Sequence, residues 1–361
     1  SHKEQRMNVS EDAVAKAEHL LNQRKLTQAL KRFNEADALR TDTNRCAVGR
    51  WMAHMLLGKF QLAWRESDAI RARTPHDPNR FWRGEDLHGK RVVLRCLHGF
   101  GDAVQFLRFV PWLYAIAADV IVEVPPKLLE LAPMFAGVEH VITWGEQAPP
   151  MPPEWDVQVE INELPYLFRL DVAQLPIAER YLRIPPAIIA RHAVSSRQAA
   201  SLKVGVVWAG GEWNPSRSIP FEDIRRILHV EDCEFWNLQG GTPRSAWPVG
   251  LDQLHAAEGC EDSIVVLAAL IAQMDLMITS DTLAAHLAGA QGVPCWVILR
   301  HAADWRWMHT REDSPWYPSI RLFRCGLDEG WGVPMSRVTR ALHTLVAQRR
   351  AVQEATAASS S

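Results

Sequence analysis

The sequence predicts a short all-α array at the N-terminal end, followed by two α/β lobes that are each built on a parallel sheet. Three observations support this fold class. The chain has 361 residues, enough for about two or three domains. Residues 10–73 are helix-forming, without strand-like alternation. After a breaker cluster at residues 74–78, apolar strands alternate with helical segments, which is typical of doubly wound parallel sheets.

The helical part contains an internal repeat. The sequence around Lys25 and Ala29 returns around Lys59 and Ala63, with a period of 34 residues. This period, with a small residue where two helices cross, is typical of tetratricopeptide repeats. The alternative is two unrelated helix pairs that share a spacing by chance. Because an array of two units is shorter than the roughly three needed for independent stability, we expect it to dock on the rest of the chain.

The α/β part divides into two successive lobes. Strands are expected at residues 91–97, 120–124 and 138–143 in the first lobe, and at 203–209, 234–238, 276–279 and 295–299 in the second. Helices are expected at 102–117, 127–135, 221–228, 263–273 and 282–291. The predicted domains are therefore the array (1–78), the first lobe (79–186), the second lobe (187–334), a C-terminal helix (335–350) and a disordered tail (351–361). Ligands of such sheets bind at the carboxyl ends of the strands.

Charge and cysteine usage exclude several classes of protein. The formal net charge is -2, so no overall basic field favours nucleic acid. The first 90 residues carry a net +5, which suits an acidic partner or a solvated face. The longest apolar run, residues 264–272, is too short to span a bilayer. Six scattered cysteines indicate neither disulfides nor a zinc site, and we expect reduced thiols in a cytoplasmic protein.

Tryptophan is unusually frequent, with 15 residues against four tyrosines. Five of them lie between residues 296 and 331, around the segments 304–307 and 313–318. Aromatic faces can stack on sugars and bases, but Trp also packs in cores when its N–H finds a partner. Both interpretations stay open from the residues alone.

A glycine-rich turn at residues 98–101 leads into a helix that carries Asp102. The positive end of a helix favours an ionised carboxylate, which could accept a proton from an attacking hydroxyl. The alternative is that Asp102 only caps the helix. The turn lacks the third glycine of a dinucleotide-binding fingerprint.

Two further turns in the second lobe suit an anion. Asp281 and Thr282 precede a helix whose free N–H groups could bind phosphate, with His286 one turn further on the same face. An N-cap with a core histidine is the alternative. Earlier, the glycine pair 210–211 and then Arg217 suit a phosphate clamp, because Arg is always charged and forks bidentately.

In their order along the chain these motifs resemble a known family. They comprise residues 99–102, 105–111, 204–210, 217–220, 237–240, 281–290, 304–307 and 313–318. Together with the array, the chain resembles the bacterial tetratricopeptide-linked glycosyltransferases related to family 9, the heptosyltransferase-like group. The resemblance covers about residues 50–345.

The resemblance implies a GT-B fold, in which two Rossmann-like lobes enclose the active site. It also implies a metal-independent, inverting transferase that uses a nucleotide-diphosphate sugar, without a cofactor. Asp102 falls on the base of that family, and Arg217 falls on a Lys that contacts the donor diphosphate. The implied donor-binding residues are Trp208, Arg217, Ser218, Gln239, Asp281, Thr282 and His286, and the implied cleft residues are Gly99, Gly101, Gln105, Asp304 and Trp305. The final helix is expected to cross back onto the first lobe.

The sequence departs from the family at two places. Leu283 stands where the family usually has Gly, and the segment between Gly211 and Arg217 is short. We expect a protein or peptide acceptor on the array, and no nucleic acid or transmembrane segment. The alternatives are a GT-B epimerase or hydrolase, with Glu212, Asp304 and Asp313 as possible further carboxylates, and a non-catalytic scaffold that binds nucleotide sugars.

Overall fold

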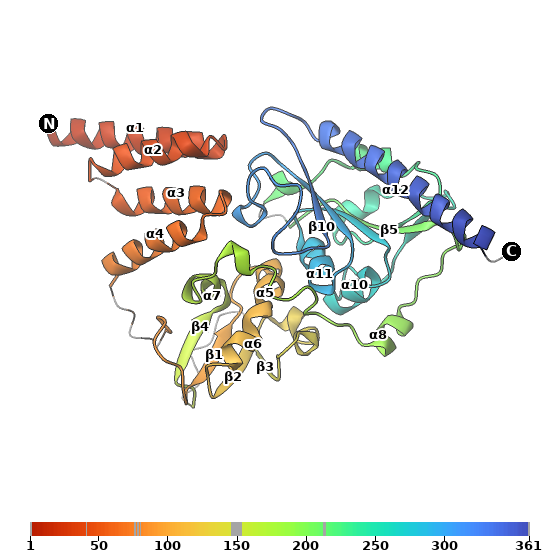
Figure 1. The fold of residues 1–361 in the computed structure, drawn as a ribbon, viewed down its shortest axis with the longest axis horizontal. Helices are drawn as coiled ribbons and strands as arrows, with labels where there is room; N and C mark the ends of the chain where they lie inside the picture. The colour runs from red at the N-terminus through yellow and green to blue at the C-terminus, as the bar shows by residue number, and fades with distance from the viewer. Residues whose placement is uncertain are drawn as a thin grey trace.

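The computed structural model describes residues 2–40, 42–75, 77, 79, 81–145, 154–211 and 214–359. Figure 1 shows a helical array at the N-terminal end, a first α/β lobe, and a second α/β lobe with the C-terminal helix along its outer side. Two α/β lobes with parallel sheets, preceded by helices, confirm the predicted fold class at this level.

The array consists of four helices: α1 (His2–Asn22), α2 (Leu26–Asp37), α3 (Thr43–Leu56) and α4 (Phe60–Arg73). Helix α1 packs on α2, α3 packs on α4, and α2 joins the two pairs. Ala29 and Ala63, the repeated small residues, are both fully buried, so each allows close helix packing. The array is therefore helical as predicted, and its assignment to tetratricopeptide repeats stays a prediction.

The array docks on both lobes. The indole N–H of Trp64 donates a hydrogen bond of 2.8 Å to the carbonyl of Leu170 in the first lobe. On the other side, the ring of Trp51 meets Trp305 of the second lobe edge-on, with centroids 5.7 Å apart. The expected docking of this short array is confirmed. Residues of α3 and α4 share one continuous core with both lobes.

The first lobe has a four-stranded parallel sheet in the order β3-β2-β1-β4. Its elements are β1 (Arg91–Arg95), α5 (Phe100–Phe106), α6 (Val110–Tyr114), β2 (Asp119–Val124), β3 (His140–Thr143), β4 (Val157–Glu160) and α7 (Leu164–Leu167), and α8 (Pro186–Arg191) follows at the junction of the lobes. The three predicted strands are confirmed. Strand β4 was not predicted from the sequence, because its four residues are too short to show a clear period.

Two predicted helices of this lobe differ from the structure. The segment 127–135 forms only short 3-10 turns at Pro126–Leu128 and Ala132–Met134. Pro133 has no N–H to donate and cannot continue an α-helix at this point. The segment 102–117 is divided into α5, a 3-10 turn and α6, which has Pro111 in its first turn.

The second lobe has a six-stranded parallel sheet in the order β10-β9-β8-β5-β6-β7. Its elements are β5 (Leu202–Val207), α9 (Phe221–Ile224), β6 (Cys233–Asn237), β7 (Leu254–Ala256), α10 (Ile264–Ile271), β8 (Leu276–Ser280), α11 (Leu283–Gln291), β9 (Cys295–Leu299), β10 (Ile320–Arg324) and α12 (Gly332–Ser359). The four predicted strands form the centre of the sheet. The two edge strands were not predicted: β7 has three residues, and β10 carries arginines within its apolar run.

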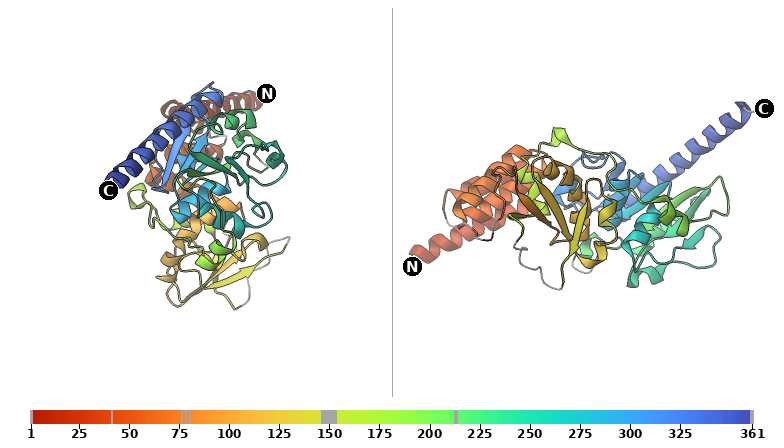
Figure 2. Two further views of the ribbon diagram at one scale, coloured as in Figure 1. Left: turned by 90° about the vertical axis from the view of Figure 1, so that its right-hand side faces the viewer. Right: turned by 90° about the horizontal axis from the view of Figure 1, so that it is seen from below.

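The C-terminal helix corrects two predictions. Helix α12 buries Met335, Val338 and Leu342 in the core of the second lobe, against α9 and β10, and does not pack on the first lobe. The spacing of these residues places one apolar stripe on the second lobe. The helix also continues to Ser359, so the expected disorder of residues 351–361 is wrong as far as that residue. Figure 2 shows its end projecting beyond the lobes.

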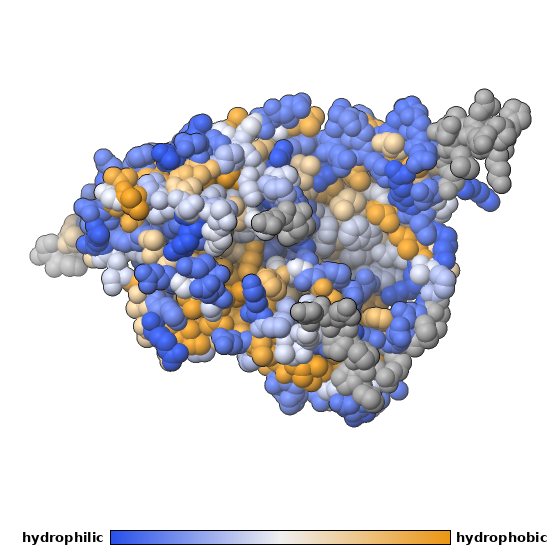
Figure 3. Space-filling view, turned by 180° about the vertical axis from the view of Figure 1, so that it is seen from behind, coloured by the Kyte–Doolittle hydropathy of each residue, from blue (hydrophilic) through white to orange (hydrophobic). Residues whose placement is uncertain are grey.

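The described surface is mainly hydrophilic, and the cysteine side chains are buried. In the view of Figure 3, hydrophilic side chains cover most of the face, and hydrophobic ones lie in separate patches. All six cysteines are buried free thiols. Within the described residues, no helix has the length and apolar character needed to cross a membrane.

The packing of α12 leads to a first prediction. Leu342→Ala removes a fully buried side chain from the second-lobe core and should lower the free energy of unfolding by about 2–5 kcal/mol. Val352→Ala, at a position 66% exposed on the projecting end of the same helix, is the matched control and should change it by less than about 0.5 kcal/mol. Denaturant titration of both variants measures the difference, and equal losses would contradict the packing described here.

Candidate active site between the lobes

A cleft of about 970 Å³ lies between the two lobes. The turn after β1 supplies one wall, and the turns after β5, β6 and β8 supply the others. These are the carboxyl ends of parallel strands, where such sheets bind ligands. Of the sequence-predicted residues, the cleft wall contains Gly99, Gly101, Asp102, Arg217, Ser218, Gln239, Asp281, Thr282, His286 and Asp304.

Three predicted residues lie outside the cleft wall. The ring of Trp208 is buried in the second-lobe core, between Phe221 and Trp247. The side chain of Gln105 is buried beneath the cleft. Trp305 faces the array. For these tryptophans, the structure favours packing over the alternative of stacking on a ligand.

Asp102 lies in the first turn of α5, on the first lobe. Its Oδ1 accepts a hydrogen bond of 2.5 Å from Nη2 of Arg306, which belongs to the second lobe. Its Oδ2 lies over Gly99, 3.5 Å from the position that a Cβ would take there. Gly99, not Asp102, occupies the N-cap position, and no side chain caps this helix. The interpretation of Asp102 as a simple cap is therefore wrong.

Arg306 is a site residue that the sequence analysis missed. It lies in a 3-10 turn, Trp305–Trp307, and its side chain is only 10% exposed. Its Nε donates to Oε1 of Gln105 at 2.7 Å, and its Nη1 lies 3.2 Å from Oδ2 of Asp304. A buried cation needs such partners. The sequence does place Arg306 between two tryptophans. An arginine in a segment that is buried with its aromatic neighbours needs a carboxylate partner, and this pattern could have indicated the role of Arg306.

The charge balance around Arg306 favours its protonated form. Burial lowers the pKa of this guanidinium, but the carboxylates of Asp304, Asp102 and Asp281 outweigh that effect and raise it. Arg306 therefore stays a fixed cation between the lobes. It neutralises acidic side chains that come from both lobes.

On the donor side predicted from the sequence, Arg217 faces Asp281. Nη1 of Arg217 lies 3.3 Å from Oδ2 of Asp281. Asp281 is buried, and burial raises the pKa of its carboxyl group, an effect that Arg306 opposes and Asp304 strengthens. The ionised form of Asp281 is therefore costly, so this carboxylate competes only weakly for Arg217.

Two polar side chains shape the loop after β5. Oγ of Ser218 accepts a hydrogen bond of 3.1 Å from the backbone N–H of Gly210. Oε1 of Gln239 accepts from the N–H groups of Trp208 and Ala209, at 2.9 Å and 2.8 Å. These contacts hold the backbone that lines the cleft. Ser218 and Gln239 therefore stabilise the loop conformation through these hydrogen bonds.

Helix α11 presents its N-terminus to the cleft. Thr282 occupies the N-cap position, and its Oγ1 is hydrogen-bonded to Oγ1 of Thr279 at 2.9 Å. Leu283, the departure from the family pattern, follows in the cleft wall. The first backbone N–H groups of the helix therefore lie where an anionic ligand group would be stabilised.

His286 lies one turn further along α11. Its Nδ1 is 2.8 Å from the hydroxyl of Tyr317, and its ring stacks on Trp307 with centroids 5.6 Å apart. Burial, together with the positive charge of Arg306 and other arginines, lowers the pKa of His286 well below its usual value. The imidazole is therefore neutral near pH 7. Tyr317 is a second residue that the sequence analysis placed only in an aromatic block.

A glycine brings the two lobes together at this point. A Cβ at Gly101 would lie 2.8 Å from Cδ2 of His286 and 3.3 Å from its Nε2. Any larger side chain would therefore push α5 away from α11. Gly101 serves the close approach of the two helices, which brings Asp102 and His286 to one cleft.

The carboxylates proposed for the epimerase or hydrolase do not gather in the cleft. Asp304 lines it, but Asp313 is exposed and paired with Arg311 at 2.7 Å. Glu212 lies outside the described residues. In the described part of the chain, no three His, Cys, Asp or Glu side chains come close enough to hold a metal ion.

Comparison with solved structures agrees with this two-lobed fold. The structure superposes on the family 9 glycosyltransferase from Veillonella parvula with a TM-score of 0.51 and 14% identity, over 73% of this chain and 99% of that one. It superposes on the ADP-heptose heptosyltransferase II of E. coli with a TM-score of 0.52 and 14% identity, over 72% and 99%. The chain therefore shares the two-lobed fold of these two structures.

No model of a known protein family matches the chain. A distant relative is Protein FlbA of Caulobacter vibrioides, 27% identical over 324 residues, which cover 81% of this chain. The match spans only 54% of FlbA, about half of that protein.

The neutral state of His286 predicts a pH effect on stability. In the unfolded chain His286 gains a proton as the pH falls below the usual histidine pKa of 6.5, whereas the buried imidazole does not. The unfolded state then binds more protons, so acidification from pH 7.5 to 5.5 should cost the wild type about 1.4 kcal/mol through this residue. His286→Gln should lack that share of the loss. Chemical denaturation at several pH values tests this, and parallel curves for the two proteins would contradict it.

Proposed function

We propose that the chain is an inverting, metal-independent glycosyltransferase, which moves a sugar from a nucleotide-diphosphate sugar to an acceptor hydroxyl. One observation carries the proposal: a carboxylate on the first lobe faces a cation, a helix N-terminus and a neutral histidine on the second lobe, across one cleft. Asp102 stands on one side, and Arg217, the start of α11 and His286 stand on the other. Glycosyltransferases share the fold in which this arrangement occurs.

In the proposed reaction Asp102 acts as the base. Its carboxylate accepts the proton of the acceptor hydroxyl while the hydroxyl oxygen attacks the anomeric carbon of the donor sugar. The bond from that carbon to the diphosphate oxygen breaks in the same step, so the configuration inverts. Gly99 leaves room beside Oδ2 of Asp102 for the acceptor.

The second lobe receives the charge that develops on the leaving diphosphate. Arg217 supplies a guanidinium, and the first N–H groups of α11 supply a positive dipole end. His286, being neutral, would donate one hydrogen bond without adding charge. These groups are already in place before the reaction. They can therefore stabilise the developing charge without a free-energy cost for reorganising during the reaction.

The proposed acceptor is a protein or peptide bound on the helical array. The array docks against both lobes and contributes to the same core as the cleft residues. Its net positive charge favours an acidic segment of the partner. An acceptor held there would meet the cleft without a long linker.

A thermal-shift panel of nucleotides tests the donor side. Of the UDP, ADP, GDP and CMP compounds, at least one should raise the melting temperature of the wild type, with an affinity then measured by calorimetry. Arg217→Gln should weaken that affinity about tenfold to a hundredfold, because a charge-assisted contact to the phosphates is lost. If no nucleotide binds, the proposal fails in favour of a scaffold without a donor site.

Asp102→Asn tests the catalytic side. It should keep nucleotide affinity within about twofold and lower sugar transfer by about a hundredfold or more, because the proton acceptor is lost. Asp252→Asn, an exposed carboxylate paired with Arg197 away from the cleft, is the control and should leave both unchanged. Transfer by Asp102→Asn at nearly the wild-type rate would overturn the assignment of the base. Rapid turnover of the donor without any acceptor would favour the epimerase or hydrolase instead.

A further inference from the structure

A second cavity, of about 300 Å³, lies where the helical array meets the second lobe. The end of α1, the turn that follows it and α3 supply one wall, and the segments after β5 and β9 supply most of the rest. The cavity shares the side chains of Arg217, Asp281 and Asp304 with the cleft. A group bound in this cavity is therefore separated from the cleft by a single layer of side chains.

Arg24 reaches the cavity from the array. Its Nη1 donates to the carbonyl of Leu21 at 3.0 Å, and its Nη2 donates to the carbonyl of Ala303 in the second lobe. Its Nε–H is buried and has no acceptor in the described part of the chain. Burial lowers the pKa of Arg24, an effect that Asp304 opposes. A negatively charged acceptor in the cavity would offset the cost of burying this guanidinium.

Arg300 reaches the same cavity from the second lobe, directly after β9. Its Nη1 donates to the carbonyl of Ser216 at 3.2 Å, and its guanidinium carbon lies 5.9 Å from the centroid of the Trp331 ring. These partners are neutral, as are the carbonyls that accept from Arg24. Among the described residues, neither arginine forms an ion pair. Two positive charges, one on each side of the cavity, are thus without a counter-charge in contact.

Each carboxylate in the cavity wall already has a partner. Asp304 lies 3.2 Å from Nη1 of Arg306, and Asp281 lies 3.3 Å from Nη1 of Arg217. The wall contains three arginines and these two aspartates, so its formal charge is +1. One carboxylate would balance this charge, whereas a phosphate group, with a charge of about −1.5 to −2 at pH 7, would exceed it.

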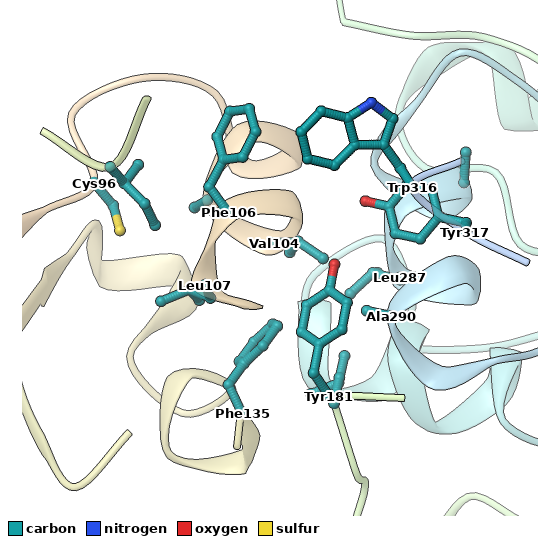
Figure 4. Close-up of a cluster of buried hydrophobic side chains, with 14 of the residues drawn as sticks. Cys96, Val104, Phe106, Leu107, Phe135, Tyr181, Leu287, Ala290, Trp316 and Tyr317 are labelled. Carbon is teal, nitrogen blue, oxygen red and sulfur yellow. The ribbon is translucent and has the colours of Figure 1, made fainter. Parts of the chain in front are cut away.

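The aromatic wall of the cavity is fixed by packing. Trp305 stacks on Phe106 of the first lobe with centroids 6.5 Å apart, and it meets Trp316 edge-on at 6.1 Å. In Figure 4 Phe106 and Trp316 lie side by side in the buried cluster between the lobes. Together with Met52 of α3, Trp305 offers an apolar surface to the methylene groups of a bound side chain. Apolar walls with a few placed charges are typical of ligand sites.

We propose that this cavity binds the carboxylate of a Glu or Asp side chain of the acceptor protein, between Arg24 and Arg300. The inference rests on the proposed function and gives its acceptor a chemistry: an acidic residue close in sequence to the hydroxyl that receives the sugar. The array and the second lobe each supply one arginine, so the site is complete only where the two meet. A carboxylate held there fixes the acceptor segment beside the cleft.

Binding of a fluorescein-labelled hexaglutamate peptide to the full chain tests the charge, with hexaglutamine as the neutral probe. We expect hexaglutamate to bind at least about tenfold more tightly in fluorescence anisotropy at low salt. Arg300→Gln should weaken its affinity about fivefold to tenfold, because a charge-assisted contact is lost. The matched control is Arg65→Gln on α4, an exposed arginine that forms no ion pair with the described residues, and it should stay within about twofold.

A second variant separates binding from docking of the array. Arg24→Gln should weaken hexaglutamate binding as Arg300→Gln does, but it also removes the contact of the array with Ala303. Asn22→Asp leaves that contact in place and adds a carboxylate to the cavity wall at an exposed position, with almost no change of shape. It should weaken hexaglutamate binding about fivefold and leave the melting temperature unchanged. Wild-type affinity in Arg300→Gln or Asn22→Asp, or an equal loss in Arg65→Gln, would overturn the inference.

Photo-crosslinking locates the bound peptide. Hexaglutamate that carries a benzophenone group should attach to both walls of the cavity, within residues 21–52 of the array and residues 298–305 of the second lobe. Mass spectrometry of the digested product identifies the sites of attachment. Attachment only outside these two segments would contradict the proposed site.

The two proposals fail in different ways. If no nucleotide raises the melting temperature, the proposed function fails, and the peptide experiments still decide whether the cavity binds a carboxylate. If a nucleotide binds but hexaglutamate binds no better than hexaglutamine, the carboxylate site fails, and the donor site stands.

Discussion

The buried guanidinium of Arg306 is the contact on which the rest of the site depends. Burying a charge costs several kcal/mol unless partners surround it, and here the partners come from different lobes. Asp102 and Gln105 belong to the first lobe, and Asp304 belongs to the second. Removing any one of them leaves a charge or a polar group without compensation. The cost of separating these groups therefore holds the lobes in one relative position, and that position determines where Asp102 stands in the cleft.

The close approach of the two lobes limits which residues can occupy their interface. Gly101 allows α5 to approach His286, and Gly289 allows the ring of Tyr317 to lie on α11. Arg306 is committed to carboxylates, and His286 is neutral, so neither provides a cation that is free for a ligand. The charge for an anion then comes mainly from Arg217 and the start of α11. The cost of ionising buried Asp281 weakens its competition for Arg217, and this favours the binding of an anion in the cleft.

Much of this could be predicted from the sequence, and the exceptions have physical reasons. Central strands such as β5 and β8 are continuous apolar runs, and turns such as the one before Asp102 carry their own glycines, so both were predicted. Arg306 and Tyr317 were missed as site residues because their roles arise from contacts with distant residues, 204 positions away for Arg306 and 31 for Tyr317, and no local period encodes such contacts. The predicted position of α12 was wrong because it followed the family resemblance. The apolar stripe in the sequence of this helix, which packs on the second lobe, was not used. Trp208 was predicted to bind the donor because its sequence motif lies in the second lobe near the cleft. Its ring is instead buried in the second-lobe core.

The 3-10 turn Trp305–Trp307 connects the array with both lobes, since its three side chains face three different parts of the molecule. Trp305 packs against Trp51 of the array, and Trp307 stacks on His286 in the cleft wall. Between them Arg306 reaches Asp102 on the first lobe. A rotation of this turn would move all three contacts at once, because consecutive side chains of so short a turn share one backbone. The array is therefore mechanically connected to the cleft through buried aromatic rings, and a partner bound on the array would bear on the same turn that holds Asp102. The excess of tryptophan in this segment thus has a physical role: rigid rings fix the turn at the junction of the array and the two lobes.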